Sequence, residues 1–138
     1  MVLGAINHVA LTVSNLDKSL KFYQPILTFL GYKNTENYPG VAIWESETTG
    51  SAVNLWEAKP ELVSYAHKLY APGLHHLAFN ADSPAQIDRF YQLLLQIDAK
   101  ILNPPAEYDY APGYYAVFFT DPDGLKLELA HVPGLKVE

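Results

Sequence analysis

The sequence has 138 residues and contains no cysteine, a single arginine and no long hydrophobic run. Without cysteine, disulfides, thiolate metal ligands and cysteine nucleophiles are excluded. The longest apolar run, residues 114–119, is far too short to cross a bilayer, and the N-terminal segment does not resemble a signal peptide. The net charge of −6 gives no attraction to a polyanion. We therefore expect a cytoplasmic protein that binds a small molecule and neither nucleic acid nor membrane.

The sequence does contain an internal repeat. Residues 7–13 align with residues 75–81, and residues 22–24 align with residues 90–92 at the same spacing. Farther along, Gly50 aligns with Gly124, so the aligned blocks keep their order. The repeat predicts one domain over residues 1–138, built from two similar modules. The expected bounds are 1–66 for module one, 59–73 for a connector and 74–138 for module two.

Each module has the same predicted order of elements. An alternating strand, at 6–13 and 74–81, is followed by an amphipathic helix and then by about three strand-like segments. Ser14, three residues before Asp17, is the expected N-cap of the first helix. Ser83 is the expected N-cap of the second helix, with Pro84 at its first position. The order predicts an α+β fold of two equivalent modules.

The alternation of side chains along the strands places several polar residues on one face. His8 points away from the bulky aliphatic residues of its strand, which pack under the helix, and His76 does so in the second module. His75 falls on the helix side by the same argument. Asn54 and Glu128, each four residues after a repeat-equivalent glycine, share the face of the two histidines.

If the two modules form one curved sheet with the helices outside, these polar residues converge on its concave face. Two imidazoles and one carboxylate suit a divalent Fe, Mn, Ni, Co or Zn ion. We therefore predict His8, His76 and Glu128 as metal ligands, and Asn54 as a weak or water-mediated fourth. In the competing interpretation the histidines are hydrogen-bonded core residues and Glu128 pairs with Lys126.

An aromatic segment, residues 107–115, contains four tyrosines, which is unusual for a loop. One interpretation is a hydrophobic lid or dimer contact. The other is the wall of a substrate pocket, for which the candidate residues are Trp56, Tyr114 and Tyr115. The sequence favours neither.

Three segments, residues 7–11, 74–79 and 119–129, together resemble the vicinal oxygen chelate superfamily. This group contains glyoxalases, bleomycin-resistance proteins and extradiol dioxygenases. The resemblance covers essentially the whole chain. It implies paired βαβββ modules, a cup-shaped mixed sheet with helices on its outer face, and a metal near the floor of the cup. It also implies a homodimer, which is common in this superfamily.

The resemblance also implies four ligand positions, which fall here on His8, Asn54, His76 and Glu128. Asn54 departs from the usual Glu or Gln, and because an amide cannot take a proton from carbon, Glu128 becomes the one candidate catalytic carboxylate. Glutathione recognition would require guanidinium groups, and Arg89 is the only arginine, which argues against classical glyoxalase I.

Two other branches of the superfamily share part of the pattern. A thiol transferase acting on fosfomycin resembles this sequence in using His, His and Glu, but has Thr where this sequence has Ala10. An extradiol ring-cleaving enzyme would add an acid–base group, for which Tyr114 and Tyr115 are the candidates.

The sequence thus predicts a metal-dependent glyoxalase-like enzyme of lyase, isomerase or dioxygenase type, which chelates a small oxygen-bearing substrate through its metal. The alternative is a metal-free drug- or metabolite-binding protein of the bleomycin-resistance type. The reaction, the substrate and the identity of the metal stay open.

Overall fold

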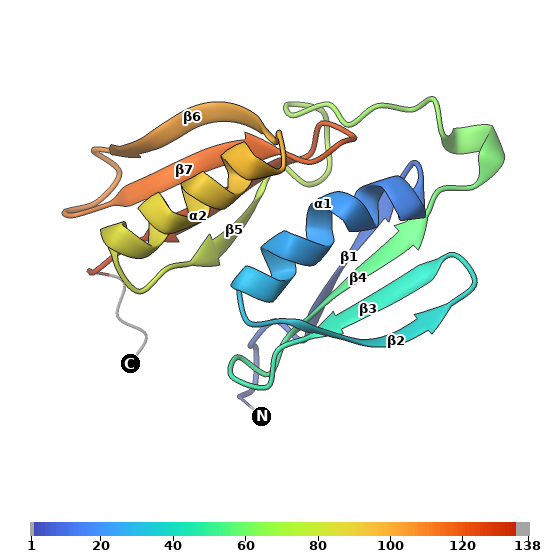
Figure 1. Cartoon of the computed structure of the whole chain (residues 1–138), viewed down its shortest axis with the longest axis horizontal. Helices are drawn as coiled ribbons and strands as arrows, with labels where there is room; N and C mark the ends of the chain where they lie inside the picture. Colours follow the sequence, from blue (N-terminus) through green and yellow to red (C-terminus); the bar gives the residue numbers. More distant parts are fainter. Residues whose placement is uncertain (1, 135–138) are drawn as a thin grey trace. The chain divides into compact units, whose positions relative to one another are not determined.

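The structure is a computed structural model that describes residues 2–134. Residues 1 and 135–138, the outer ends of the predicted domain, lie outside the described residues. The chain divides into two compact units, residues 1–66 and 67–138. Among the described residues each unit has one α-helix and a four-stranded mixed sheet (Figure 1). The predicted α+β fold of two βαβββ modules is confirmed.

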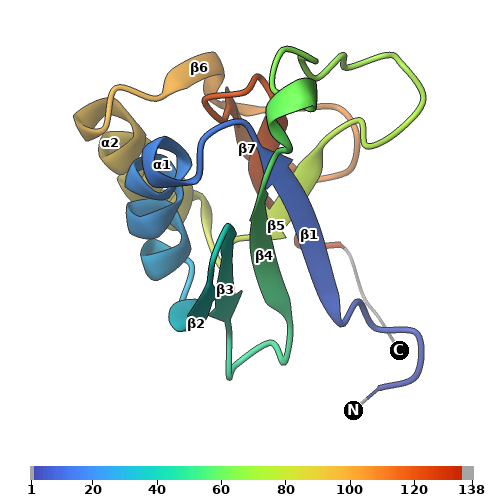
Figure 2. The same ribbon diagram turned by 90° about the vertical axis from the view of Figure 1, so that its right-hand side faces the viewer.

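The first unit consists of β1 (His8–Val13), α1 (Leu16–Phe29), β2 (Lys33–Tyr38), β3 (Val41–Glu45) and β4 (Ala52–Glu57). Its strand order is β1-β4-β3-β2, with β1 parallel to β4 and the other pairs antiparallel. Helix α1 lies on one face of this sheet (Figure 2). Val13, Leu27 and Leu55 are fully buried, so the alternating aliphatic residues of the strands form the predicted core with the helix.

Helix α1 begins one residue later than the predicted cap implies. Asn15, not Ser14, is the N-cap: its backbone is extended and its side-chain oxygen accepts a 2.9 Å hydrogen bond from the Lys18 N–H. The carboxylate of Glu57 accepts a further bond of 3.1 Å from the Leu16 N–H. Ser14 was the wrong residue because a cap must directly precede the first helical residue, which is Leu16.

The second unit consists of β5 (Leu77–Asn80), α2 (Pro84–Gln96), β6 (Lys100–Glu107), β7 (Tyr115–Thr120) and β8 (Lys126–His131). Its strand order, β5-β8-β7-β6, repeats that of the first unit, again with one parallel pair, β5 with β8. Ser83 caps α2 as predicted, accepting a 3.2 Å bond from the Gln86 N–H, and Pro84 is its first residue. A short 3₁₀ turn, η1 (Pro60–Leu62), precedes this unit.

The turn between β7 and β8 fixes the register of the strand that carries the candidate carboxylate. Gly124 has a positive φ of 86° and donates a 3.0 Å hydrogen bond to the Asp121 carbonyl. The side chain of Asp121 accepts two more bonds, each 2.9 Å, from the N–H groups of Asp123 and Leu125. As a result, Glu128 pairs with Phe118 of β7 on one side and lies beside β5 on the other.

Strand β5 is shorter than the predicted strand and begins at Leu77. His75 and His76 therefore precede the strand instead of lying within it. The alternation rule applies only inside a strand, so it does not fix the direction of the His75 side chain.

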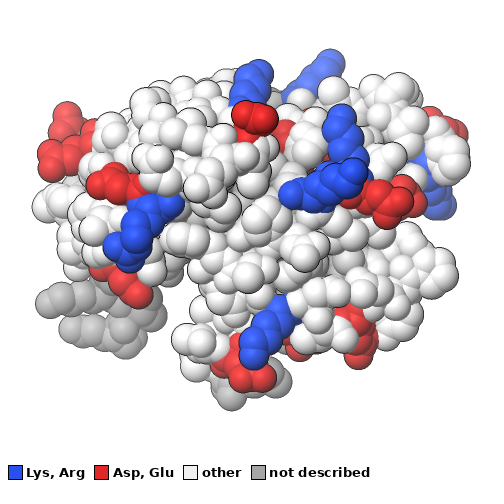
Figure 3. Space-filling view, viewed as in Figure 1, with Lys and Arg blue, Asp and Glu red and all other residues white. Residues whose placement is uncertain are grey.

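The surface carries charges of both signs. On the face shown in Figure 3, the basic and acidic side chains lie next to one another without a large area of one sign. Among residues 2–134, no helix is long and apolar enough to span a membrane.

Candidate functional site

Glu128 is the centre of the candidate site in the second unit. It lies on β8, on the face away from α2, and its side chain is only 2% exposed. A carboxylate removed from water is costly unless it is hydrogen-bonded or paired with a positive group. The burial of Glu128 therefore requires partners for its carboxylate oxygens.

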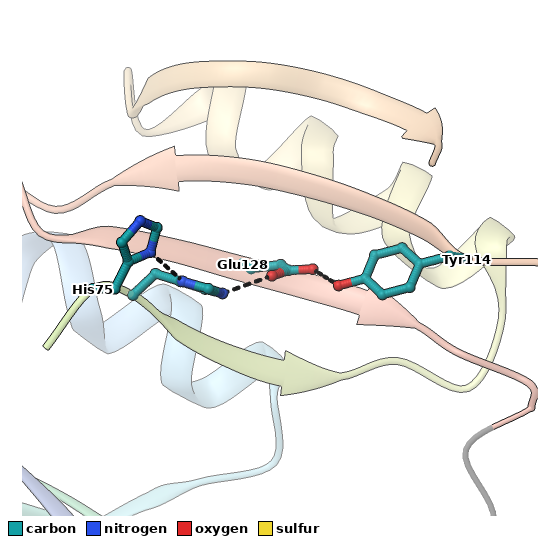
Figure 4. Close-up of polar contacts among 4 residues, drawn as sticks. His75, Tyr114 and Glu128 are labelled. Carbon is teal, nitrogen blue, oxygen red and sulfur yellow. Dashed lines mark hydrogen bonds and ion pairs between the residues drawn. The ribbon is translucent and has the colours of Figure 1, made fainter. Parts of the chain in front are cut away.

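Each oxygen of Glu128 has its own partner. The Nε2 atom of His76 lies 3.3 Å from Oε1, and the hydroxyl of Tyr114 donates a hydrogen bond to Oε2. Figure 4 shows the Glu128 carboxylate between the Tyr114 hydroxyl and the imidazole that contacts His75. Glu128 and His76, predicted to act together, are thus adjacent, and Lys126 is not the partner of the carboxylate. The ammonium group of Lys126 lies 4.7 Å from the centre of the Phe118 ring.

His75 contacts the imidazole of His76 that faces Glu128. The two Nδ1 atoms are 2.7 Å apart. Loss of surrounding water lowers the pKa of His75 below its ordinary value, and the nearby charges of His76, Lys126 and His67 lower it further. These effects favour the neutral form of the His75 ring, in which one nitrogen can accept a hydrogen bond.

Tyr114 is held as a hydrogen-bond donor. Burial raises the pKa of its phenol, and the hydrogen bond to Glu128 and the charge of that carboxylate raise the pKa further. The group stays protonated at any physiological pH, so its single proton is available to Oε2 of Glu128.

Aromatic rings surround the Tyr114 hydroxyl on one side. Tyr108 stacks on Tyr110 with ring centres 5.4 Å apart, and Tyr114 meets Tyr110 edge-on at 5.2 Å. Tyr108 also meets Phe118 edge-on at 5.4 Å. We call Tyr108, Tyr110, Tyr114 and Phe118 the aromatic cluster. It provides apolar surface next to Glu128, as the pocket-wall interpretation of residues 107–115 requires.

Tyr115 lies on the other face of the sheet from the aromatic cluster. Its hydroxyl donates a 2.6 Å hydrogen bond to Asp88 of α2, which raises the pKa of Tyr115 to about 12. The prediction placed Tyr114 and Tyr115 together in a pocket, and this is corrected: consecutive residues entering a strand point to opposite faces.

In the first unit, three predicted residues share the sheet face opposite α1. In the register of β1 with β4, His8 pairs with Ala52 and Ala10 with Asn54, so His8, Asn54 and Trp56 point the same way. Trp56 is 51% exposed. The side-chain oxygen of Asn54 is buried and has no hydrogen-bond partner among the described residues. An unpaired buried oxygen is costly, and a water or an ion would satisfy it.

His8 makes one side-chain contact that parallels that of His76. Its Nδ1 lies 2.7 Å from the side-chain oxygen of Asn7. In both histidines, therefore, Nδ1 contacts the side chain of the preceding residue. The sequence reasoning gave no role to Asn7 or His75, although the alignment of residue 7 with residue 75 was a visible signal.

Imidazole nitrogens and a carboxylate oxygen are suitable ligands for a divalent metal ion. Two ligands of one ion, each about 2.1 Å from it, lie about 3.0–3.4 Å apart at octahedral or tetrahedral angles. The 3.3 Å between Nε2 of His76 and Oε1 of Glu128 falls in this range. Within residues 2–134, no group of three His, Asp or Glu side chains gathers to hold a metal. The structure thus brings together two of the three predicted ligands, and His8 belongs to the other unit.

Comparisons with known proteins agree over nearly the whole chain. Residues 5–129 match the family model described as Glyoxalase/Bleomycin resistance protein/Dioxygenase superfamily. The chain is 32% identical over 128 residues to YqjT, an uncharacterized protein of Bacillus subtilis, covering 90% of this chain and 96% of YqjT. It is 30% identical over 132 residues to the metallothiol transferase FosB of Shouchella clausii, covering 93% of this chain and 80% of FosB.

A solved structure has the same fold. A candidate glyoxalase from Bacillus halodurans superposes with a TM-score of 0.84 at 25% sequence identity. The match covers 94% of this chain and 96% of that one. The fold of this chain is therefore one that a solved structure already contains.

Proposed function

This chain belongs to the Glyoxalase/Bleomycin resistance protein/Dioxygenase superfamily, and from this premise we propose that it is a metal-dependent enzyme acting on a small oxygen-bearing substrate. His8, His76 and Glu128 are the proposed ligands of a divalent Fe, Mn, Ni, Co or Zn ion. The observation that carries the proposal is the nearly inaccessible carboxylate of Glu128, held 3.3 Å from Nε2 of His76. A buried acid facing an imidazole is costly in an ordinary core but suits a cation site.

A bound metal would supply a Lewis acid that polarises adjacent oxygens of the substrate. The residues of the chain supply the rest. Glu128 is the candidate proton carrier: its Oε1 faces His76, and its Oε2 accepts the Tyr114 hydroxyl. Tyr114 keeps the carboxylate in one orientation. The rings of the aromatic cluster exclude water from that side of Glu128 and offer apolar surface to the substrate.

Asn54 and Trp56 are the further candidate residues of the first unit. The unpaired side-chain oxygen of Asn54 would bond a weakly held water or the ion itself. Because an amide does not ionise, Asn54 takes no part in proton transfer. The half-exposed ring of Trp56 is a candidate substrate contact. A homodimer and a cytoplasmic location stay predictions.

The second candidate is a metal-free protein that binds a drug or metabolite. The aromatic cluster favours it, since stacked and edge-on rings beside a carboxylate can hold a flat ligand without any metal. In that case Glu128 and His76 would be a charge-paired group beneath the ligand.

Metal binding separates the two candidates. Purified protein is stripped with a chelator and titrated calorimetrically with Mn²⁺, Co²⁺, Ni²⁺ and Zn²⁺. We expect about one ion per chain, with binding lost in His8→Ala, His76→Ala and Glu128→Gln. His131→Ala is the matched control, because His131 bonds the Ala81 carbonyl at 3.2 Å and is not a proposed ligand. Fe²⁺ is titrated in the same way under anaerobic conditions, and wild-type protein that binds none of the five ions would overturn the enzyme proposal.

A further inference from the structure

We propose that Asn7 and His75 are positioning residues that fix the ring tautomer of His8 and His76, so that each proposed ligand keeps an unprotonated Nε2. The inference rests on the proposed function for its purpose, but its evidence is the contacts of the two histidines. Neither Asn7 nor His75 contacts a metal or a substrate in this scheme. Each acts through the histidine that follows it.

In the first unit the direction of the hydrogen bond is set by chemistry. The side-chain oxygen of Asn7 can only accept, and it lies 2.7 Å from Nδ1 of His8. Nδ1 of His8 must therefore carry the ring proton. A neutral imidazole has one proton, so Nε2 is left with a lone pair, the form in which a histidine binds a metal.

In the second unit the same atom of His76 is engaged. Nδ1 of His76 lies 2.7 Å from Nδ1 of His75, while Nε2 faces Oε1 of Glu128 at 3.3 Å. Without an ion, Nε2 of His76 carries the proton toward the Glu128 carboxylate. When Nε2 binds an ion shared with Glu128, the ring proton moves to Nδ1 and is donated to His75. His75 then accepts on Nδ1 and carries its own proton on Nε2.

The two contacts arise at repeat-equivalent positions from different residue types. Residue 7 aligns with residue 75, and residue 8 with residue 76, yet one acceptor is an amide and the other an imidazole. In both modules, a side chain that can accept a hydrogen bond contacts Nδ1 of the following histidine. Metal-binding histidines generally donate their second nitrogen to such a partner, and loss of the partner commonly weakens metal affinity about 10- to 100-fold.

The experiment measures the tautomers directly by long-range ¹H–¹⁵N correlation NMR on protein loaded with Zn²⁺, and for His8 on chelator-treated protein as well. A pH of about 8, above the ordinary histidine pKa of about 6.5, favours neutral rings. His131 is an internal reference, since its Nδ1 bonds a backbone carbonyl in every variant. The wild-type protein should show the Nδ1–H pattern at His8 and at His76.

Matched substitutions separate an acceptor from mere bulk. Asn7→Leu and His75→Phe remove the acceptor at similar size, so the affected histidine should lose the Nδ1–H pattern and Co²⁺ affinity should fall about 10- to 100-fold. Asn7→Asp keeps an acceptor oxygen, and His75→Asn gives the second unit the acceptor of the first. Both should restore the pattern and most of the affinity.

The outcomes distinguish this inference from the proposed function. Wild-type spectra with the proton on Nε2 of either histidine would overturn the inference, even if the protein binds metal. So would unchanged spectra in Asn7→Leu and His75→Phe. If the wild-type protein takes up no metal, the metal-dependent function fails, while the positioning role of Asn7 stands if His8 shows the Nδ1–H pattern without metal and loses it in Asn7→Leu.

Discussion

Substitution of Tyr114 by Phe tests the account of the buried carboxylate. The change removes only the hydroxyl that donates to Oε2 of Glu128. Because Glu128 is 2% exposed, water cannot readily replace the lost donor. A hydrogen bond to a charged group contributes about 1.5–3 kcal/mol. Tyr114→Phe should therefore lower the free energy of unfolding by about that amount, roughly a ten- to hundredfold change in the folding equilibrium.

Urea denaturation at neutral pH measures this loss. Far-UV circular dichroism is the appropriate signal, because both tryptophans, Trp44 and Trp56, lie in the first unit and would not report on the second. The midpoint should fall by roughly 1 M urea with an unchanged slope. Tyr110→Phe is the matched control: Tyr110 belongs to the same cluster but is 70% exposed, so its loss should stay within about 0.5 kcal/mol. Equal effects of the two substitutions would refute the reasoning.

Three further predictions concern other parts of the fold. The bond to Asp88 raises the pKa of Tyr115 to about 12, above the ordinary value of about 10. The stabilisation that this bond gives the folded protein is therefore complete below about pH 10 and is lost as pH rises through about 12. Denaturation across this range should show a fall in the free energy of unfolding at high pH that Tyr115→Phe lacks. Asn15→Ala removes the cap of α1 and should cost about 0.5–2 kcal/mol in urea denaturation, whereas Ser14→Ala should cost less. Gly124→Ala meets no neighbour within 4 Å but must adopt a φ of +86°, so thermal denaturation should show a loss of about 1–2 kcal/mol from backbone strain alone.

The sequence predicted the parts of the structure that depend on periodicity. Alternation along β1, β4 and β8 correctly placed His8, Asn54 and Glu128 on the sheet faces opposite the helices, because a strand turns each successive side chain by half a turn. The repeat predicted the two modules, since equivalent sequences fold into equivalent units. Hydrophobic spacing and a Ser-Pro start located α2.

The errors arose where an element ends. His75 was assigned to the helix side because the strand was drawn from residue 74, whereas β5 begins at Leu77. Ser14 was the expected cap because Asp17 follows it by three residues, but the spacing does not fix the first helical residue, which is Leu16. The bonds of Tyr114 to Glu128 and of Tyr115 to Asp88 depend on contacts between segments far apart in sequence, which no local pattern contains.

The connection between β6 and β7 gives the second module an aromatic surface that the connection between β2 and β3 does not provide in the first. In the first unit, residues 39–40 suffice to join β2 to β3, whereas residues 108–114 join β6 to β7 and carry three tyrosines of the aromatic cluster. The two histidines come from symmetric positions of the repeat, but the rings have no counterpart in the first module. The two modules thus keep histidine at equivalent positions, whereas the aromatic surface beside the histidine belongs to the second module alone.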